Sequence, residues 1–289
     1  MAHTILKFKN REEWLQSRTL GIGASEVGTL LGLNPFETPY QLWRRKKGLD
    51  GPKQENNAMI MGHLFEDAVA QMFAAQTDAK IIKNSVDDFT IYDNDRPYMR
   101  VSPDRVYWNK DTKHNEKNKR LLECKTTLLT IDGDNPPKSW FCQLQYQLGV
   151  SGYNYGSLAW IMLNKREFDY RTYAFDDEFF EFIVGKVDEF WNRYIVGNEE
   201  PIAYRVSDTI IKYPKEEKGK SIELTESLSD AIEDLRSVKE KISALEAKKK
   251  QDEAIIKMEM KDAESIISGD EIVATWKANK AGTRRFVLI

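Results

Sequence analysis

The chain has 289 residues, of which 41% are hydrophobic and 31% are charged, and this balance is typical of a soluble globular protein. Its 43 Lys and Arg residues against 46 Asp and Glu residues exclude a strongly basic nucleic-acid binder. They do not exclude a protein that holds DNA through metal ions and a few basic groups. Two cysteines are too few for a disulfide framework, and no apolar run reaches the ~18–20 residues of a membrane-spanning helix.

The N-terminal residues lack the apolar core of a signal peptide, so we expect a cytoplasmic protein with no membrane partner. Hydrophobic periodicity predicts helices at 10–17, 38–47, 58–76, 138–151 and 176–196. A further helix is predicted from Gly23 onward, with Ser25 as its N-cap. Strands are predicted at 89–92, 97–101, 104–108, 120–126, 156–163 and 169–175. Strands flanked by helices on both sides indicate an α/β (α+β) fold with a central mixed sheet.

The pattern of polar and apolar residues changes after Pro201. Residues 213–223 are polar and are typical of a linker. A long amphipathic helix is predicted at about 225–264, because apolar residues recur there at heptad spacing. The heptad pattern breaks at Lys249 and Asp252, which argues against a long dimeric coiled coil and favours packing on the body or a short arm.

A β-hairpin is predicted at 271–289, with its turn at 279–282. We therefore divide the chain into a domain at 1–212 and a C-terminal extension at 213–289, which comprises the linker, the amphipathic helix and the hairpin.

The residues that suggest chemistry are Asp104, in Ser-Pro-Asp, and the Glu123-Cys124-Lys125 triplet. Side chains alternate along a strand, so Glu123 and Lys125 should share one face. Asp104 and Glu123, with the backbone carbonyl of Cys124, offer the oxygen ligands that Mg²⁺ prefers. Lys125 can orient or deprotonate a water, or stabilise negative charge developing on a phosphate. Alone, such a triplet is also a common surface feature.

Two helices carry further polar candidates. Glu66 lies within the apolar helix at 58–76, where it either reaches the metal cluster or marks a solvated face together with Asp67. Gln143 begins a series of glutamines in the helix at 138–151, which either bond groups near the sheet or form a polar stripe.

A phosphate site is predicted near the second helix. Glycines before a helix start expose backbone N–H groups that attract phosphate. Ser25 can donate its hydroxyl to a phosphate oxygen, and Arg18 can clamp that group with two hydrogen bonds. A plain N-cap beside a surface arginine explains the same residues equally well. The basic run Arg44–Lys47 either contacts a DNA backbone or forms a solvated face.

Taken together, five segments resemble the lambda-exonuclease/YqaJ family of phage recombination nucleases, a branch of the PD-(D/E)xK superfamily. The segments are RTLGIGASEV, MGHLFEDAV, SPDRV, LLECKTT and FCQLQYQLGVSG, and they occur in the family's order between Trp14 and about Gly197. The resemblance implies a restriction-endonuclease-like core and a nuclease that degrades one strand of duplex DNA from its 5′ end, leaving 3′ overhangs for recombination.

The resemblance also implies roles for individual residues. Asp104, Glu123 and Glu66 match the metal-binding acids, Lys125 matches the catalytic lysine, and Gln143 matches the glutamine behind the site. Arg18 and Ser25 match the pair that holds the 5′-phosphate. Two Mg²⁺ ions per site are implied, with Mn²⁺ as a substitute.

The implied partners are double-stranded DNA ends and a single-strand annealing protein of the RecT/Red-beta type, with a homo-oligomer, a ring trimer above all, in the cytoplasm of a bacterium carrying the phage or prophage. Arg105 departs from the family, which usually has glycine there. A PD-(D/E)xK endonuclease and a non-catalytic DNA-end-binding protein are the alternative functions.

Overall fold

The computed structural model describes residues 2–51, 56–83, 89–131, 135–279 and 282–289. Its contacts divide the chain into two compact units, Met1–Lys215 and Glu216–Ile289. Within the described residues, no helix combines the length and apolar character that crossing a bilayer requires.

The first unit is built on a five-stranded mixed sheet with the strand order β3-β6-β7-β8-β9. These strands are β3 (Lys80–Lys83), β6 (Arg105–Trp108), β7 (Lys119–Thr127), β8 (Tyr155–Met162) and β9 (Glu167–Ala174). Strands β7 and β8 are parallel, whereas the other neighbouring pairs are antiparallel. A parallel pair needs a crossover connection, and α5 (Lys138–Ser151) supplies it.

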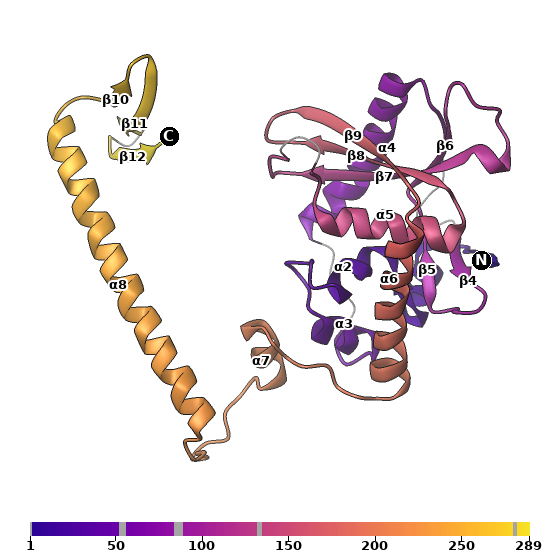
Figure 1. The fold of residues 1–289 in the computed structure, drawn as a ribbon, viewed down its shortest axis with the longest axis horizontal. Coiled ribbons are helices and arrows are strands. Elements are labelled where there is room, and N and C mark those ends of the chain that lie inside the picture. Colours follow the sequence, from indigo (N-terminus) through magenta and orange to yellow (C-terminus); the bar gives the residue numbers. More distant parts are fainter. Residues whose placement is uncertain (1, 52–55, 84–88, 132–134, 280–281) are drawn as a thin grey trace. The chain divides into compact units, whose positions relative to one another are not determined.

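Two helices, α5 and α4 (Asn57–Thr77), cover opposite faces of this sheet (Figure 1). The core on the α5 side includes Leu121, Leu144, Leu148, Leu158 and Trp160. The core on the α4 side includes Val69, Phe73, Tyr107, Leu122 and Cys124. Successive residues of a strand point to opposite faces, and neighbours on β7 accordingly enter different cores.

A second layer of the first unit packs a smaller sheet and several helices on the far side of α5. The sheet has the order β1 (His3–Lys7), β4 (Phe89–Asp93), β5 (Met99–Val101) and β2 (Ile22–Gly23). The helices of this layer are α1 (Arg11–Ser17), α2 (Ala24–Leu30), α3 (Pro39–Lys46), α6 (Asp177–Glu189) and α7 (Val206–Lys212). A π-helical stretch, Phe190–Val196, continues α6, and 3₁₀ turns lie at Arg18–Leu20 and Glu116–Asn118.

The second unit consists of one long helix and a small antiparallel sheet. The helix is α8 (Glu226–Met260), and the sheet contains β10 (Ser265–Ser268), β11 (Glu271–Ala278) and β12 (Arg284–Leu288). The chain enters α8 through Thr225, whose side chain accepts the backbone N–H of Leu228 and so caps the first turn.

The predicted fold class is confirmed, because a mixed sheet is flanked by helices and followed by a long C-terminal helix with a small sheet. The differences lie in short elements. Strands β1, β2, β3 and β10 and helix α7 were not predicted, and none of them is longer than seven residues. The long helix ends at Met260 rather than near 264. Strand β10 follows it and pairs with β11, so the predicted hairpin is part of a three-stranded sheet. Two residues of its predicted turn, Lys280 and Ala281, lie outside the described residues.

Candidate active site

The carboxylate of Glu123, on β7, lies at the centre of the candidate site. Glu123 is only 2% exposed and faces α5, whereas its neighbour Cys124 joins the core beneath α4. Lys125 returns to the α5 side, where its Nζ is 2.7 Å from Oε1 of Glu123. The predicted alternation along this strand is therefore present, and it places the acid and the lysine in one ion pair.

Two glutamines of α5 hold the carboxylate of Glu123. The Nε2 of Gln143 donates to Oε1 of Glu123, and the Oε1 of Gln143 accepts from Nζ of Lys125 at 3.0 Å. The Nε2 of Gln147 donates to Oε2 of Glu123 at 2.8 Å. Residues four apart share one helix face, so the spacing could have revealed Gln147, which the sequence analysis did not single out. Gln145 does not contact Glu123 in this way; its Nε2 donates to the backbone carbonyl of Ala174, the last residue of β9.

Asp104 reaches the same edge of the sheet from the residue before β6. Its Oδ2 accepts the backbone N–H of Cys124 at 2.8 Å, and the residue is 8% exposed. Burial raises the pKa of the Asp104 carboxyl well above its ordinary value, and the charges of Glu123 and Glu66 raise it further. The surroundings of Asp104 in the folded protein therefore disfavour its negatively charged form.

Glu66 supplies a third carboxylate, from α4. Its side chain is mostly covered, and Nδ1 of His63 lies 3.0 Å from its Oε1. Burial raises the pKa of Glu66, and the charge of Glu123 acts in the same direction. Glu66 is thus not on a solvated face, whereas its neighbour Asp67 is half exposed.

The negative charges of Asp104, Glu66 and Glu123 repel one another, and a hard cation would reduce that repulsion. Among the described residues, no group of three or more His, Cys, Asp or Glu side chains is placed so that it could hold a metal ion as it stands, and both oxygens of Glu123 are engaged by α5 or by Lys125. A cation near Asp104 and Glu66 would relieve the repulsion that raises their pKa values. Mg²⁺ binds through few carboxylates and keeps several waters, so such an open set suits it.

Lys125 is held as an ammonium in this arrangement. Burial acts to lower its pKa, but the charges of Glu123 and Asp104 outweigh burial and raise the pKa above its ordinary value. An ammonium can donate hydrogen bonds and stabilise negative charge, but it cannot accept a proton.

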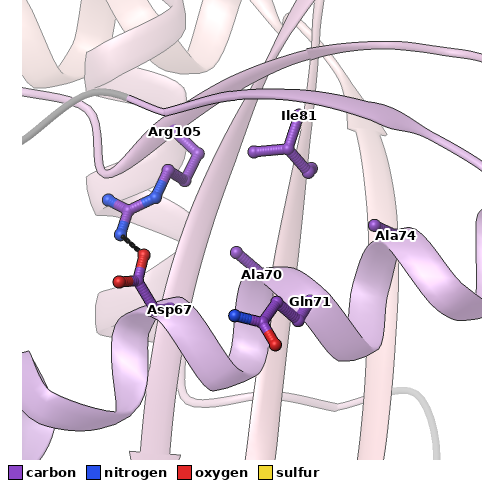
Figure 2. Close-up of a pocket in the computed structure, with 6 residues that line it drawn as sticks. All are labelled: Asp67, Ala70, Gln71, Ala74, Ile81 and Arg105. Atoms are coloured by element: carbon purple, nitrogen blue, oxygen red, sulfur yellow. Dashed lines mark hydrogen bonds and ion pairs between the residues drawn. The ribbon is translucent and has the colours of Figure 1, made fainter.

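Arg105, at the position where the resemblance led us to expect glycine, contacts the acid cluster from the α4 side. It is buried, its Nη1 donates to the backbone carbonyl of Asp104 at 2.6 Å, and its Nη2 donates to Asp67 at 2.6 Å. Figure 2 shows this pair at one end of a shallow pocket of about 300 Å³, whose wall continues along Ala70, Gln71, Ala74 and Ile81. Arg105 thus places a fixed positive charge behind Asp104 without occupying the α5 side, where Glu123 and Lys125 lie.

Arg18 and Ser25 lie together, and one tryptophan joins them to Ser102 in the Ser-Pro-Asp turn. The Nη2 of Arg18 donates to Oγ of Ser25 at 3.2 Å, and the Arg18 guanidinium lies 4.9 Å from the ring centroid of Trp14. The indole N–H of Trp14 donates to Oγ of Ser102 at 3.3 Å, two residues before Asp104. The predicted phosphate pair is therefore connected to the Ser-Pro-Asp turn by two successive contacts.

The prediction that Ser25 caps α2 is wrong. The N-cap is Gly23, and Ser25 is the second residue of the helix. The carboxylate of Glu26 accepts the backbone N–H of Gly23 at 2.7 Å, so the helix start is satisfied without Ser25. This leaves the Ser25 hydroxyl directed to Arg18.

A buried ion pair supports the same turn. The Nζ of Lys46 lies 2.8 Å from Oε2 of Glu26 and also donates to the carbonyls of Arg18 and Gly21, and its side chain is 1% exposed. At Gly21 a side chain would collide with the backbone of Tyr98, so the turn must be glycine. Burial opposes ionisation of Glu26, but Lys46, Arg45 and Arg18 lower its pKa to about 2.

The basic run Arg44–Lys47 is neither a solvated face nor a row of free cations. Arg45 pairs with Glu26 at 2.8 Å and with Glu37 at 2.9 Å, while Lys46 is enclosed beside Glu26. Arg44 pairs with Asp50, and Lys47 bonds Asn198 and a backbone carbonyl of the π-helical stretch. The interpretation as a solvated face is therefore wrong for Arg45 and Lys46, which fold inward against Glu26 and Glu37, whereas a contact of this run with a DNA backbone stays a prediction.

Comparison with solved structures shows that this fold is shared. The alkaline exonuclease LHK-Exo from Laribacter hongkongensis is similar at a TM-score of 0.51 and 18% sequence identity, over 64% of this chain and 93% of that chain. The same enzyme in complex with dAMP is similar at a TM-score of 0.52 and 17% identity, with the same coverage.

Comparison of sequences agrees with the resemblance drawn from the five segments. A family model described as the YqaJ-like viral recombinase domain matches residues 13–154. The uncharacterized protein YqaJ of Bacillus subtilis (strain 168) is 30% identical over 289 residues, which covers 96% of this chain and 87% of that protein. The chain therefore belongs to the YqaJ-like viral recombinase family.

Proposed function

We propose that this chain is a metal-dependent exonuclease that degrades the 5′-ended strand of double-stranded DNA and leaves 3′ overhangs for phage-type recombination. The fold shared with an alkaline exonuclease supports the nuclease class. The observation that carries the proposal further is the connection of Arg18 and Ser25, through Trp14 and Ser102, to Asp104. A phosphate-binding pair linked to the turn that carries Asp104 would suit cleavage next to a DNA end rather than at an internal position.

Each part of the site has a distinct task in this proposal. Asp104, Glu123, Glu66 and the carbonyl of Cys124 hold Mg²⁺, with two ions in a complete site and Mn²⁺ as a substitute. When bound, the metal supplies Lewis-acid activation of the scissile phosphate and of the attacking water.

The side chains of α5 and β7 then act on geometry and charge. Gln143 and Gln147 fix both oxygens of Glu123, so that this carboxylate keeps one orientation. Lys125, which stays protonated beside Glu123, stabilises negative charge that develops on the phosphate during cleavage. Arg18 and Ser25 bind the terminal 5′-phosphate, because a guanidinium matches two phosphate oxygens.

The proposal extends to the assembly. A ring of three copies around the duplex would keep the enzyme on DNA without a basic net charge, which here is −3. A single-strand annealing protein of the RecT/Red-beta type would take up the 3′ strand. Sedimentation on and off linear duplex, with and without a purified annealing protein, tests both statements.

The deciding experiment is a time course with Mg²⁺ on linear and on closed circular duplex, labelled at either the 5′ or the 3′ end. We expect early release of the 5′ label as mononucleotide, retention of the 3′ strand, and no cleavage of the closed circle. The Glu123→Gln variant, which preserves the shape of the side chain, serves as the inactive control. Cleavage of closed circles would identify an endonuclease, and binding of ends without hydrolysis would identify a non-catalytic protein.

The phosphate pair is tested separately by comparing 5′-phosphate and 5′-hydroxyl ends. We expect Arg18→Ala to reduce cleavage of phosphorylated ends by about tenfold, the loss of one charge-assisted contact, and to leave hydroxyl ends nearly unchanged. Arg11, whose guanidinium is 5.7 Å from the same Trp14 ring, gives the matched control in Arg11→Ala. An equal loss on both ends would remove this role from Arg18.

A further inference from the structure

Within the second unit, helix α8 leaves a continuous apolar stripe uncovered along its first two-thirds. The helix is uninterrupted from Glu226 to Met260 (Figure 1), and of its residues, all of which are described, Met260 alone is buried. Leu235 is 55% exposed and Leu245 is 66% exposed, and the other large side chains of the stripe are similarly open. Side chains of this size seldom form a long row on a surface that has no partner.

The stripe has the spacing of a coiled-coil seam. In a heptad lettered a to g, position a is filled by Leu228, Leu235 and Ile242, and position d by Ala231, Val238 and Leu245. Three consecutive heptads with apolar a and d positions reach the shortest length at which the pattern indicates a coiled coil.

The seam ends where the unit's own sheet begins to cover the helix. The next a and d positions are Lys249 and Asp252, which are charged. Phe286 and Leu288 of β12 line a pocket of about 320 Å³ together with this part of α8 and with Leu245 and Lys248 at the end of the seam, and Nζ of Lys257 is 5.4 Å from the Phe286 ring. The break at Lys249 and Asp252, which argued against a long coiled coil, therefore marks the end of a short one.

The charges beside the seam select the partner. Positions g and e flank it, and in a parallel pair each g residue lies opposite the e residue five positions later on the other helix. Asp234 at g would meet Lys239 of a second copy, and Lys241 at g would meet Glu246. Both pairs have opposite signs. In the part of the chain that the structure describes, none of these four side chains has an ion-pair partner.

We propose that residues 228–248 of α8 form a parallel coiled coil with a second copy of this chain. The parallel orientation pairs all four charges. An antiparallel alignment of the same apolar layers would pair Asp234 with Lys241 but would leave Glu246 opposite the uncharged Thr225. This interface depends neither on the proposed nuclease activity nor on the proposed ring of three copies, since it uses residues outside the first unit.

The test is sedimentation of the full chain over a range of concentrations, with charge reversals at Lys241 and Glu246. We expect the wild-type chain to self-associate, and Glu246→Lys to raise the dissociation constant about tenfold, because attractive pairs become repulsive. The double variant Lys241→Glu/Glu246→Lys restores opposite signs and should restore association. Glu240→Lys makes the same change of charge at position f, on the opposite face, and should have no effect.

Cross-linking then tests the orientation. Both natural cysteines are buried, so a thiol introduced at Val238 would be the exposed one. In a parallel pair the two copies of position 238 are adjacent, and Val238→Cys should form an interchain disulfide on mild oxidation, whereas Glu240→Cys should not. A chain that stays monomeric at every concentration, as expected if the stripe packs on its own first unit, would overturn the proposal. Association indifferent to the charge reversals would do the same.

Discussion

Two buried carboxylates of the first unit, Glu26 and Asp104, are almost equally shielded from solvent and yet differ in the direction of their pKa shifts. At Glu26, burial is overcome by Lys46, Arg45 and Arg18, and the pKa falls to about 2. At Asp104, burial and two neighbouring acids act together, and the pKa rises well above its ordinary value. Burial alone therefore says little about the charge of an acid, because the sign of its neighbours decides the outcome.

The difference separates a structural part of the site from the part that we propose to be reactive. Glu26 has its full set of cations and closes a turn, so its ion pairs serve to hold Arg18 and Ser25 in place. Asp104 stands in an excess of negative charge that Lys125 and Arg105 only partly offset. Sites with unrelieved charge of this kind are where proteins bind ions and perform chemistry.

The largest expected effect comes from removing the cation of the reactive part. Lys125→Ala should lower the rate of DNA hydrolysis by about 10³-fold, since a group that stabilises transition-state charge is lost. The control is Lys119→Ala on the same strand, whose ammonium pairs with the exposed Glu116 and lies outside the acid cluster. Hydrolysis near the wild-type rate in Lys125→Ala would place the chemistry elsewhere, and circular dichroism verifies that both variants are folded.

The next effect concerns the structural part. Glu26→Gln should destabilise the protein by about 3 kcal/mol, because Lys46 is left buried without a counter-charge. The free energy of unfolding is measured in urea with chelator present. The double variant Glu26→Gln/Lys46→Met should recover part of the loss, since no buried charge remains unpaired. A double variant no more stable than Glu26→Gln alone would show that the pair does not act as a unit.

Much of the reactive part could be predicted from the sequence, and little of the structural part could. The alternation of Glu123 and Lys125 follows from the period of a strand, and Asp104 lies near them because β6 and β7 are adjacent in the chain. Lys46 could not be placed, because a run of four basic residues gives no sign of which side chain turns inward. Its partner Glu26 is 20 positions earlier, and only the packing of α3 near α2 brings them together.

Arg105 and Gln147 were missed or left open for related reasons. Arg105 follows Asp104 directly, so its pairing with Asp67 of α4 depends on how that helix crosses the sheet. Gln147 had a signal in its spacing from Gln143, but a glutamine on an amphipathic helix is ordinary until a carboxylate is found opposite. The short strands at the edges of the sheets carry too few residues for any period to show.

Lowering the pH tests the structural part without a change of residue. The pKa of Glu26 is depressed from 4.5 to about 2 in the folded state, so its stabilisation is complete above pH 4.5 and is lost as the pH falls toward 2. At pH 3 the wild-type protein should have lost about 2 kcal/mol from this residue, whereas Glu26→Gln should lack that component. Unfolding curves of both proteins between pH 6 and pH 3 measure the difference, and parallel pH dependences would contradict the assignment.

The smallest effect has the opposite sign and is the sharpest test of the comparison. Asp104→Asn keeps the acceptor for the backbone N–H of Cys124 but removes a charge that Glu123 and Glu66 repel. We expect the variant to be inactive and, in chelator at pH 7.5, about 1 kcal/mol more stable than wild type. Millimolar Mg²⁺ should raise the melting temperature of the wild-type protein, because the cation relieves the repulsion between Asp104 and the two other acids. The melting temperature of the variant should change little, because this repulsion is missing there. If Asp104→Asn instead destabilised the protein as Glu26→Gln does, the two carboxylates would be structural alike, and the acid cluster would have no need of a metal ion.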